Sequence, residues 1–235
     1  MPRHSKLALR IARAVETEIV ESHWPIGHSL GSEAALIERF GVSRAVMREA
    51  VRIVESHGVA QMRLGPGGGL TVTSPSAEVV LESTALLLDH AGVTPRDLFE
   101  ARNAVELTCV DLAAERIDEE GIERLRAVLE ESHENPLEQS HMLQMAIAKA
   151  TGNPALELLV EVLHRLMAAY TPETPITTEF ADEVRNADAA IVAAIVAGDR
   201  SLAQHRLRRH LATTISAQYQ LDLDHADLRP VVPAK

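Results

Sequence analysis

The 235-residue chain is poor in cysteine, with Cys109 as its single example. One thiol cannot form a disulfide within the chain, and such sparing use of cysteine is typical of a reducing compartment. Cys109 lies in an apolar helical pattern, where a thiol is most simply a core residue. A chain of this length can bury a core without covalent cross-links.

Long hydrophobic runs are also missing. No apolar stretch approaches the roughly 20 residues that a membrane-spanning helix needs, and the first residues, Met-Pro-Arg-His-Ser-Lys-Leu, lack the apolar segment of a secretion signal. We therefore expect a cytoplasmic protein that has no membrane partner.

Positive charge is scarce overall. The 23 Lys and Arg are outnumbered by 34 Asp and Glu, which leaves a net charge of −11 and argues against a general nucleic-acid binder. The charge is uneven, however: residues 1–75 carry a net charge of +2 and residues 76–235 carry −13. A slightly basic head on an acidic body fits a DNA reader whose second domain has another task.

Enzyme signatures are absent from the sequence. We find no Ser/His/Asp pattern, no paired-carboxylate pattern and no nucleotide-binding motif. The chain is therefore not expected to be an enzyme. The alternative is a helical-bundle enzyme or small-molecule-binding protein whose N-terminal domain serves protein contacts, and turnover of a metabolite would favour it.

What the sequence does contain is a capped helix lined with arginines, at residues 43–58. Ser43 is a good N-cap and Gly58 a good C-terminal stop. Arg44, Arg48 and Arg52 are four residues apart, so they form one stripe that drifts by only about 40° per step. Such a stripe suits a recognition helix in a DNA major groove, although a solvated face on an ordinary helix would look the same.

The neighbouring segments favour the DNA-binding interpretation. Residues 32–40 predict a short helix, and Gly41 provides the turn of a helix-turn-helix. After Gly58, strand, glycine-rich turn and strand predict a β-hairpin wing that ends near residue 74. Such a wing can place Arg63 and the backbone N–H groups around Gly65 and Gly67 against phosphates.

The remainder reads as helical almost to its end. We expect a first helix over residues 6–22, a winged helix-turn-helix domain over 1–74 and a linker helix within 75–93. A helical domain is expected over 94–220, followed by a loose tail at 221–235. Four of its helices begin at Thr94, Asp118, Leu137 and Asn153, and two more end at Ala197 and near Gln220. The fold class is therefore mainly α, with a winged helix-turn-helix followed by an all-α antiparallel bundle.

In these features the sequence resembles the GntR superfamily of transcriptional regulators. The residues that carry the likeness are the runs at 30–33, 40–44 and 47–50 and the wing at 58–72. The runs at 97–102, 112–116, 148–154 and 195–199 resemble the FCD-type effector domain of its FadR subfamily. The resemblance implies DNA contacts by Arg44, Arg48 and the wing tip around Gly65. Ala34 stands where that subfamily usually has a further arginine.

The resemblance also implies a buried pocket for a small organic acid or acyl ligand. Many members hold a metal there through one Asp and three His, and those positions fall on Ser140, Gln144, Asp188 and His210. Neutral Ser and Gln are poor ligands for Zn²⁺ or Ni²⁺. We therefore expect a metal-free polar pocket and no cofactor.

Arg102 and Glu106 lie four residues apart on the helix that lines this pocket in the family. A buried arginine can hold a ligand carboxylate through two parallel hydrogen bonds, and an internal salt bridge to Glu106 is the alternative. The leading hypothesis is a homodimeric, ligand-responsive regulator, a repressor of the GntR family, that binds a short pseudo-palindromic operator. Its expected partners are double-stranded DNA, a small-molecule effector and a second copy of the chain.

Overall fold

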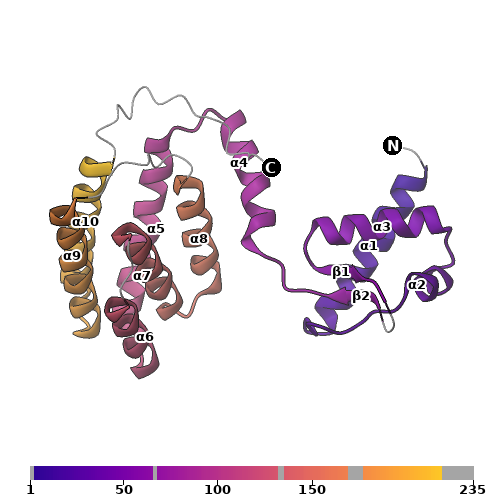
Figure 1. Cartoon of the computed structure of the whole chain (residues 1–235), viewed down its shortest axis with the longest axis horizontal. Coiled ribbons are helices and arrows are strands. Elements are labelled where there is room, and N and C mark those ends of the chain that lie inside the picture. Colours follow the sequence, from indigo (N-terminus) through magenta and orange to yellow (C-terminus); the bar gives the residue numbers. More distant parts are fainter. Residues whose placement is uncertain (1–2, 66–67, 132–134, 169–176, 219–235) are drawn as a thin grey trace. The chain divides into compact units, whose positions relative to one another are not determined.

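The computed structural model describes residues 3–65, 68–131, 135–168 and 177–218. The chain is mainly helical and has one small antiparallel sheet (Figure 1). It divides into two compact units, Met1–Val80 and Leu81–Lys235, and the division falls inside helix α4. The predicted fold class is confirmed, while the predicted segment limits at residues 74, 93 and 220 stay a prediction.

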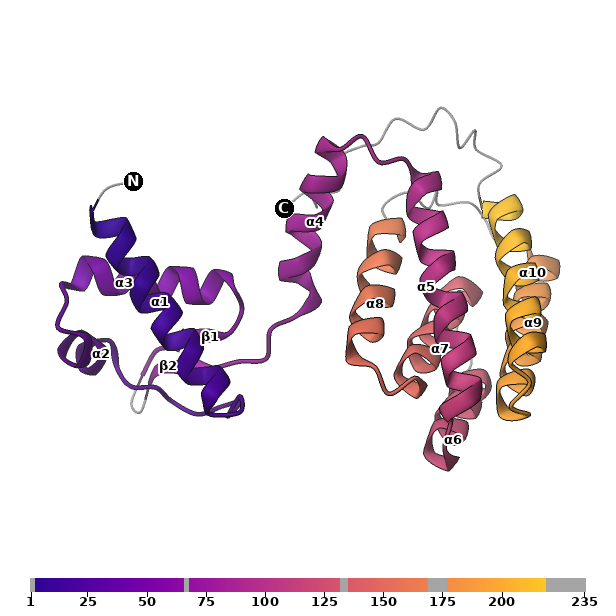
Figure 2. The same ribbon diagram turned by 180° about the vertical axis from the view of Figure 1, so that it is seen from behind.

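The first unit is a winged helix-turn-helix. Helix α1 (Arg3–Glu21) packs against α3 (Arg44–Ser56), and the short helix α2 (Glu33–Phe40) lies between them in the chain (Figure 2). Strands β1 (Ala60–Arg63) and β2 (Gly69–Val72) pair antiparallel and form the wing. Buried aliphatic side chains from α1, α2, α3 and both strands share one core.

Local chemistry fixes the turn between α2 and α3. Ser32 caps α2, since its hydroxyl accepts a hydrogen bond from the Ala35 N–H, and Ser43 caps α3 through the Val46 N–H. Between the two caps Gly41 adopts a left-handed conformation, with φ 62°, which costs glycine less than any other residue. The capped turn therefore sets the direction in which α3 leaves α2.

The wing is closed at its base by a third extended segment. Ser29 bridges to Thr71, and the carbonyl of Gly31 accepts a hydrogen bond from the N–H of Leu70. A Cβ on Gly69 would lie 2.5 Å from that carbonyl oxygen, so this close approach requires glycine.

The second unit is a bundle of helices. Its members are α5 (Pro95–Arg116), α6 (Glu119–Glu130), α7 (Pro136–Ala150), α8 (Pro154–Ala168), α9 (Thr178–Val196) and α10 (Arg200–Gln218), and α4 (Ala77–His90), in which the two units divide, precedes them in the chain. Helix α5 is central, because α7, α8, α9 and α10 all pack against it. A capping box between Thr94 and Asp97, with Pro95 at the first helical position, starts α5 as the sequence predicts.

Element limits differ from the predicted ones by a few residues at most. Helix α1 begins at Arg3 rather than at residue 6 and ends at Glu21, and two left-handed residues, His23 (φ 57°) and Trp24 (φ 52°), follow it. Gly67 and the tail predicted at 221–235 lie outside the described residues. No helix among those described is both long and apolar enough to cross a membrane.

Candidate DNA-binding and effector-binding sites

The arginine stripe lies on the solvent face of α3. The side chains of Arg44, Arg48 and Arg52 are 73%, 64% and 71% exposed, while the opposite face of the helix is buried in the core of the first unit. Arg63 ends β1 at an exposed position, and Gly65, two residues later, has φ 104°. Ser43 serves as the N-cap of α3. An exposed guanidinium stripe at the start of a capped helix can enter a major groove.

Two of these arginines have an acidic partner on the preceding helix. The Nε of Arg48 lies 3.1 Å from Oε1 of Glu33, and the Nε of Arg44 lies 3.5 Å from the same oxygen. Arg52 pairs instead with Glu49 on its own helix, at 2.6 Å. Glu33 is absent from the predicted site, because its pairing depends on how α2 and α3 fold together.

The second unit gathers the residues at the family's metal positions. Ser140 of α7 lies 3.3 Å from both the Asp188 carboxylate and the His210 ring, and His210 lies 3.7 Å from Asp188. Gln144, one turn after Ser140, is 1% exposed, and neither its amide oxygen nor its amide nitrogen has a partner among the described residues. The structure therefore buries all four side chains and brings three of them together.

Burial shifts the charge states of this cluster toward neutrality. Desolvation raises the pKa of Asp188 to about 7 and lowers the pKa of His210 to about 4. A hydrogen bond from Ser140 favours the charged form of Asp188 but does not outweigh burial.

These donors do not fit a transition-metal site. They comprise one imidazole, one carboxylate and two neutral oxygen donors, whereas Zn²⁺ prefers three or four His, Cys or carboxylate ligands. No three His, Cys, Asp or Glu side chains in the described part of the chain are placed to share a metal ion.

A second polar cluster surrounds Glu106 of α5. The Nε of Arg102 donates to Oε1 of Glu106 at 2.7 Å, and Nε2 of His164, on α8, approaches the same oxygen at 2.5 Å. Although burial alone would raise the pKa of Glu106, the charge of Arg102 and the contact with His164 lower it to about 2. The internal salt bridge between Arg102 and Glu106, which was one of the two alternatives for this pair, is therefore formed.

Unpaired polar atoms remain around this ion pair. The second carboxylate oxygen of Glu106 and Nδ1 of His141 are buried and have no partner among the described residues. The centres of the His141 and His164 rings lie 4.3 Å apart. Burial is the main cause that lowers the pKa of His141, to about 4, and the positive charges of His164 and Arg102 lower it further. The terminal nitrogens of Arg102 also lack a described partner, so only one edge of its guanidinium is occupied.

His164 was missed by the sequence analysis. A usable signal existed, since it lies four residues after Val160 and three before Met167, both of which are buried on α8. An imidazole in the buried stripe of an apolar helix needs a polar partner, and Glu106 supplies it.

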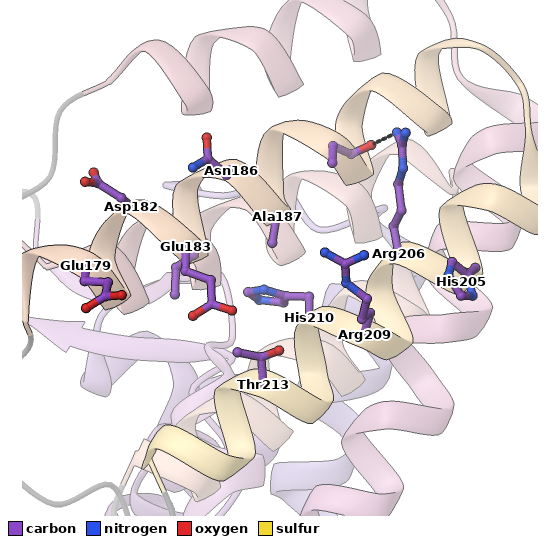
Figure 3. A pocket seen from close by; sticks show the side chains of 12 residues that line it. Glu179, Asp182, Glu183, Asn186, Ala187, His205, Arg206, Arg209, His210 and Thr213 are labelled. Atoms are coloured by element: carbon purple, nitrogen blue, oxygen red, sulfur yellow. Dashed lines mark hydrogen bonds between the residues drawn. The ribbon is translucent and has the colours of Figure 1, made fainter.

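A cleft of about 730 Å³ lies between α9 and α10, and His210 of the cluster with Ser140 and Asp188 lines it (Figure 3). Its α9 wall carries Glu179, Asp182 and Glu183, and its α10 wall carries Arg206, Arg209 and His210. In Figure 3, His210 projects into the same space as Glu183 and Thr213. His210 therefore lines the cleft and also contacts Ser140 inside the bundle.

Comparison with known proteins identifies both units. Residues 7–72 match the model of the bacterial regulatory proteins of the gntR family, and residues 97–213 match the FCD domain. The HTH-type transcriptional regulator LutR of Bacillus subtilis is 30% identical over 154 residues, which cover 63% of this chain and 69% of LutR. The chain belongs to the GntR family.

Two further similar proteins have lower sequence identity to this chain. The Exu regulon transcriptional regulator of Escherichia coli is 25% identical over 160 residues, and the match spans 66% of this chain but only 61% of that regulator, less than two thirds of its length. The solved Streptococcus agalactiae GntR has 21% identity and a TM-score of 0.64, and it covers 88% of this chain and 98% of its own. That structure supports the GntR fold of this chain.

The buried carboxylate of Asp188 gives a pH prediction. Because its folded pKa, about 7, lies above the 3.8 of an ordinary Asp carboxyl, the folded state holds this proton more tightly, and stability is lost as pH rises between these values. Asp188→Asn removes the titration while keeping the shape. We expect calorimetry of the full chain to show a higher melting temperature for the variant than for wild type at pH 8, by several degrees, since about 1 kcal/mol corresponds to roughly 2–4 °C for a chain of this size. The difference in melting temperature should be smaller at pH 5.

Asp182→Asn is the matched control, because it makes the same change at an exposed position of α9. Its effect should be small at both pH values. A wild-type protein that melts above Asp188→Asn at pH 8 would show that the carboxylate is stabilised as an anion.

The donor set around His210 gives a metal prediction. We expect purified protein to carry much less than one Zn²⁺ or Ni²⁺ per chain by elemental analysis, and chelation to leave its melting temperature unchanged. Close to one metal per chain, lost together with the His210→Ala substitution, would contradict it.

Proposed function

We propose that this chain is a ligand-responsive transcriptional regulator that binds operator DNA through α3 and the wing, and an effector within its FCD domain. The single observation that carries the proposal is the exposed arginine stripe on a capped recognition helix, in a chain of the GntR family. The relatives named above are transcriptional regulators, which favours this function over the helical-bundle enzyme.

The DNA contacts are proposed residue by residue. Arg44 and Arg48 read base edges in the major groove, and Arg52 and Arg63 neutralise phosphates beside it. Ser43 and the glycines of the wing, Gly65 and Gly67, bring backbone N–H groups against the DNA backbone. A homodimer would present two such heads to a pseudo-palindromic operator, and membership of a FadR-like subfamily belongs to the same proposal.

The effector site is proposed to lie between the two polar clusters of the bundle. Arg102 has its Nε held by Glu106 and its outer nitrogens available, which is the arrangement that a ligand carboxylate can bind bidentately. Leaving a buried amide unpaired costs roughly 1–3 kcal/mol. A hydroxyl or carbonyl of the ligand that pairs with Gln144 would remove that cost.

The ligand is proposed to enter through the cleft between α9 and α10. His210 lines this cleft and contacts Ser140, so a polar group that reaches His210 is already at the edge of the interior cluster. We propose a small organic acid that carries further hydrogen-bonding groups. Such a ligand regulates DNA binding only if it prefers one of two arrangements of the protein.

The DNA prediction concerns the arginine stripe. A duplex is first enriched from a random library with the full-length chain, and its affinity is then measured by titration. Arg44→Ala and Arg48→Ala should each cost roughly 1–3 kcal/mol of binding free energy if the contact is a bidentate base pairing. Arg13→Ala, which removes the same charge from an exposed position of α1, is the control and should have a much smaller effect. Failure of wild type to enrich any duplex would contradict the proposed function.

The effector prediction concerns the arginine fork. Small mono- and dicarboxylates are screened by thermal shift, and hits are measured by calorimetry. Arg102→Lys keeps a charge beside Glu106 but removes the fork, so it should weaken carboxylate binding about tenfold or more. Gln144→Met should weaken ligands that carry extra hydroxyl groups more than simple acids. Affinity equal to wild type in Arg102→Lys would assign this arginine to the fold alone.

A further inference from the structure

We propose that Glu33 is a positioning residue for DNA recognition, because it holds Arg44 and Arg48 in the orientation that reads bases. One oxygen, Oε1 of Glu33, lies 3.1 Å from Nε of Arg48 and 3.5 Å from Nε of Arg44. The inference rests on the proposed function and adds to it a residue that is not itself expected to touch DNA.

The fold brings Glu33 to this place. Glu33 is the first residue of α2, directly after the Ser32 cap, and the left-handed turn at Gly41 directs α3 back past it. The two arginines follow Glu33 by 11 and 15 residues, so they meet it only when both caps and the turn are formed. Glu33 is 29% exposed, and its carboxylate is therefore partly withdrawn from water.

The geometry leaves the reading edges of the arginines available. In each case the carboxylate faces Nε, and the terminal nitrogens of both guanidinium groups have no other partner in the described part of the chain. A guanidinium is planar, so fixing one edge fixes the direction of the opposite edge. The fork of two N–H groups that pairs with guanine is thus oriented before DNA arrives.

The shared carboxylate also allows the two arginines to stand close together. Arg44 and Arg48 lie one turn apart on α3, where two positive charges repel each other. A negative charge between them reduces this repulsion and leaves the group of three with a net charge of +1. Arg52 differs, because its partner Glu49 lies on the same helix and does not link it to α2.

A blocking role for Glu33 would have the opposite consequence. If the carboxylate merely competed with DNA for the arginines, its removal would strengthen binding to every duplex. If it positions them, its removal should weaken the selected duplex relative to an unrelated one. The ratio of the two affinities therefore separates the roles.

The test uses full-length Glu33→Gln and Glu33→Ala, the duplex selected with wild type, and a shuffled duplex of the same composition. Glu33→Gln should lower the ratio of selected to shuffled affinity by about tenfold, the effect of one misplaced bidentate contact. Glu33→Ala should lower it at least as far, since it also removes the hydrogen-bond acceptor. Binding to the shuffled duplex should stay equal or rise, because one negative charge is gone.

Glu38→Gln is the matched control. It lies on α2, is exposed, and has no described side-chain partner, so it makes the same charge change away from the arginines. Both affinities should rise together, and their ratio should stay constant. In an Arg48→Ala background, Glu33→Gln should lose most of its effect on the ratio, as expected for residues that act together.

Two outcomes overturn the proposal. A Glu33→Gln ratio equal to that of Glu38→Gln would leave Glu33 as an ordinary surface charge, and a higher ratio would make it a blocking group. Melting temperatures of the variants that equal that of wild type would exclude misfolding as the cause of either outcome. Failure of wild type to select any duplex would overturn the proposed function, and this inference with it.

Discussion

The second unit depends on one constraint, the compensation of the buried carboxylate of Glu106. An uncompensated carboxylate at 1% exposure would take up a proton or destabilise the bundle. Arg102 on the same helix and His164 on α8 prevent this, and they thereby join the central helix to a neighbour by polar contacts as well as apolar ones. The pairing leaves one edge of Arg102 and one oxygen of Glu106 for other groups.

The first unit uses the same device on its surface. There the Glu33 carboxylate accepts a hydrogen bond from Nε of Arg48 and forms an ion pair with Nε of Arg44, and the outer edges of both guanidinium groups stay available. Both sites combine an arginine, whose side chain has many rotamers, with a carboxylate supplied by the fold. An arginine that is already oriented loses less rotamer entropy when its ligand binds. The proposed DNA site and the proposed effector site therefore share one physical principle, the pre-orientation of an arginine, even though their proposed ligands differ.

Much of this could be predicted from the sequence, because the signals were local. Ser43, Gly41 and the spacing of Arg44, Arg48 and Arg52 specify a capped helix and its exposed stripe without reference to the rest of the chain. The gathering of Ser140, Asp188 and His210 followed from the family resemblance and not from spacing. The contacts of Glu33 and His164 escaped prediction, since each joins two helices whose packing no single helical pattern specifies.

The two polar clusters of the bundle differ in how they meet a ligand. Around Glu106 the formal charges cancel, while burial favours the neutral forms of Asp188 and His210. The proposed acid ligand would therefore meet little net positive charge, and general electrostatic attraction could not supply most of its affinity. In the proposed site, recognition would come from directed contacts, namely the free edge of Arg102 and the unpaired amide of Gln144. Such contacts discriminate by the position of hydrogen-bonding groups, because a ligand that lacks one leaves a buried polar atom unpaired.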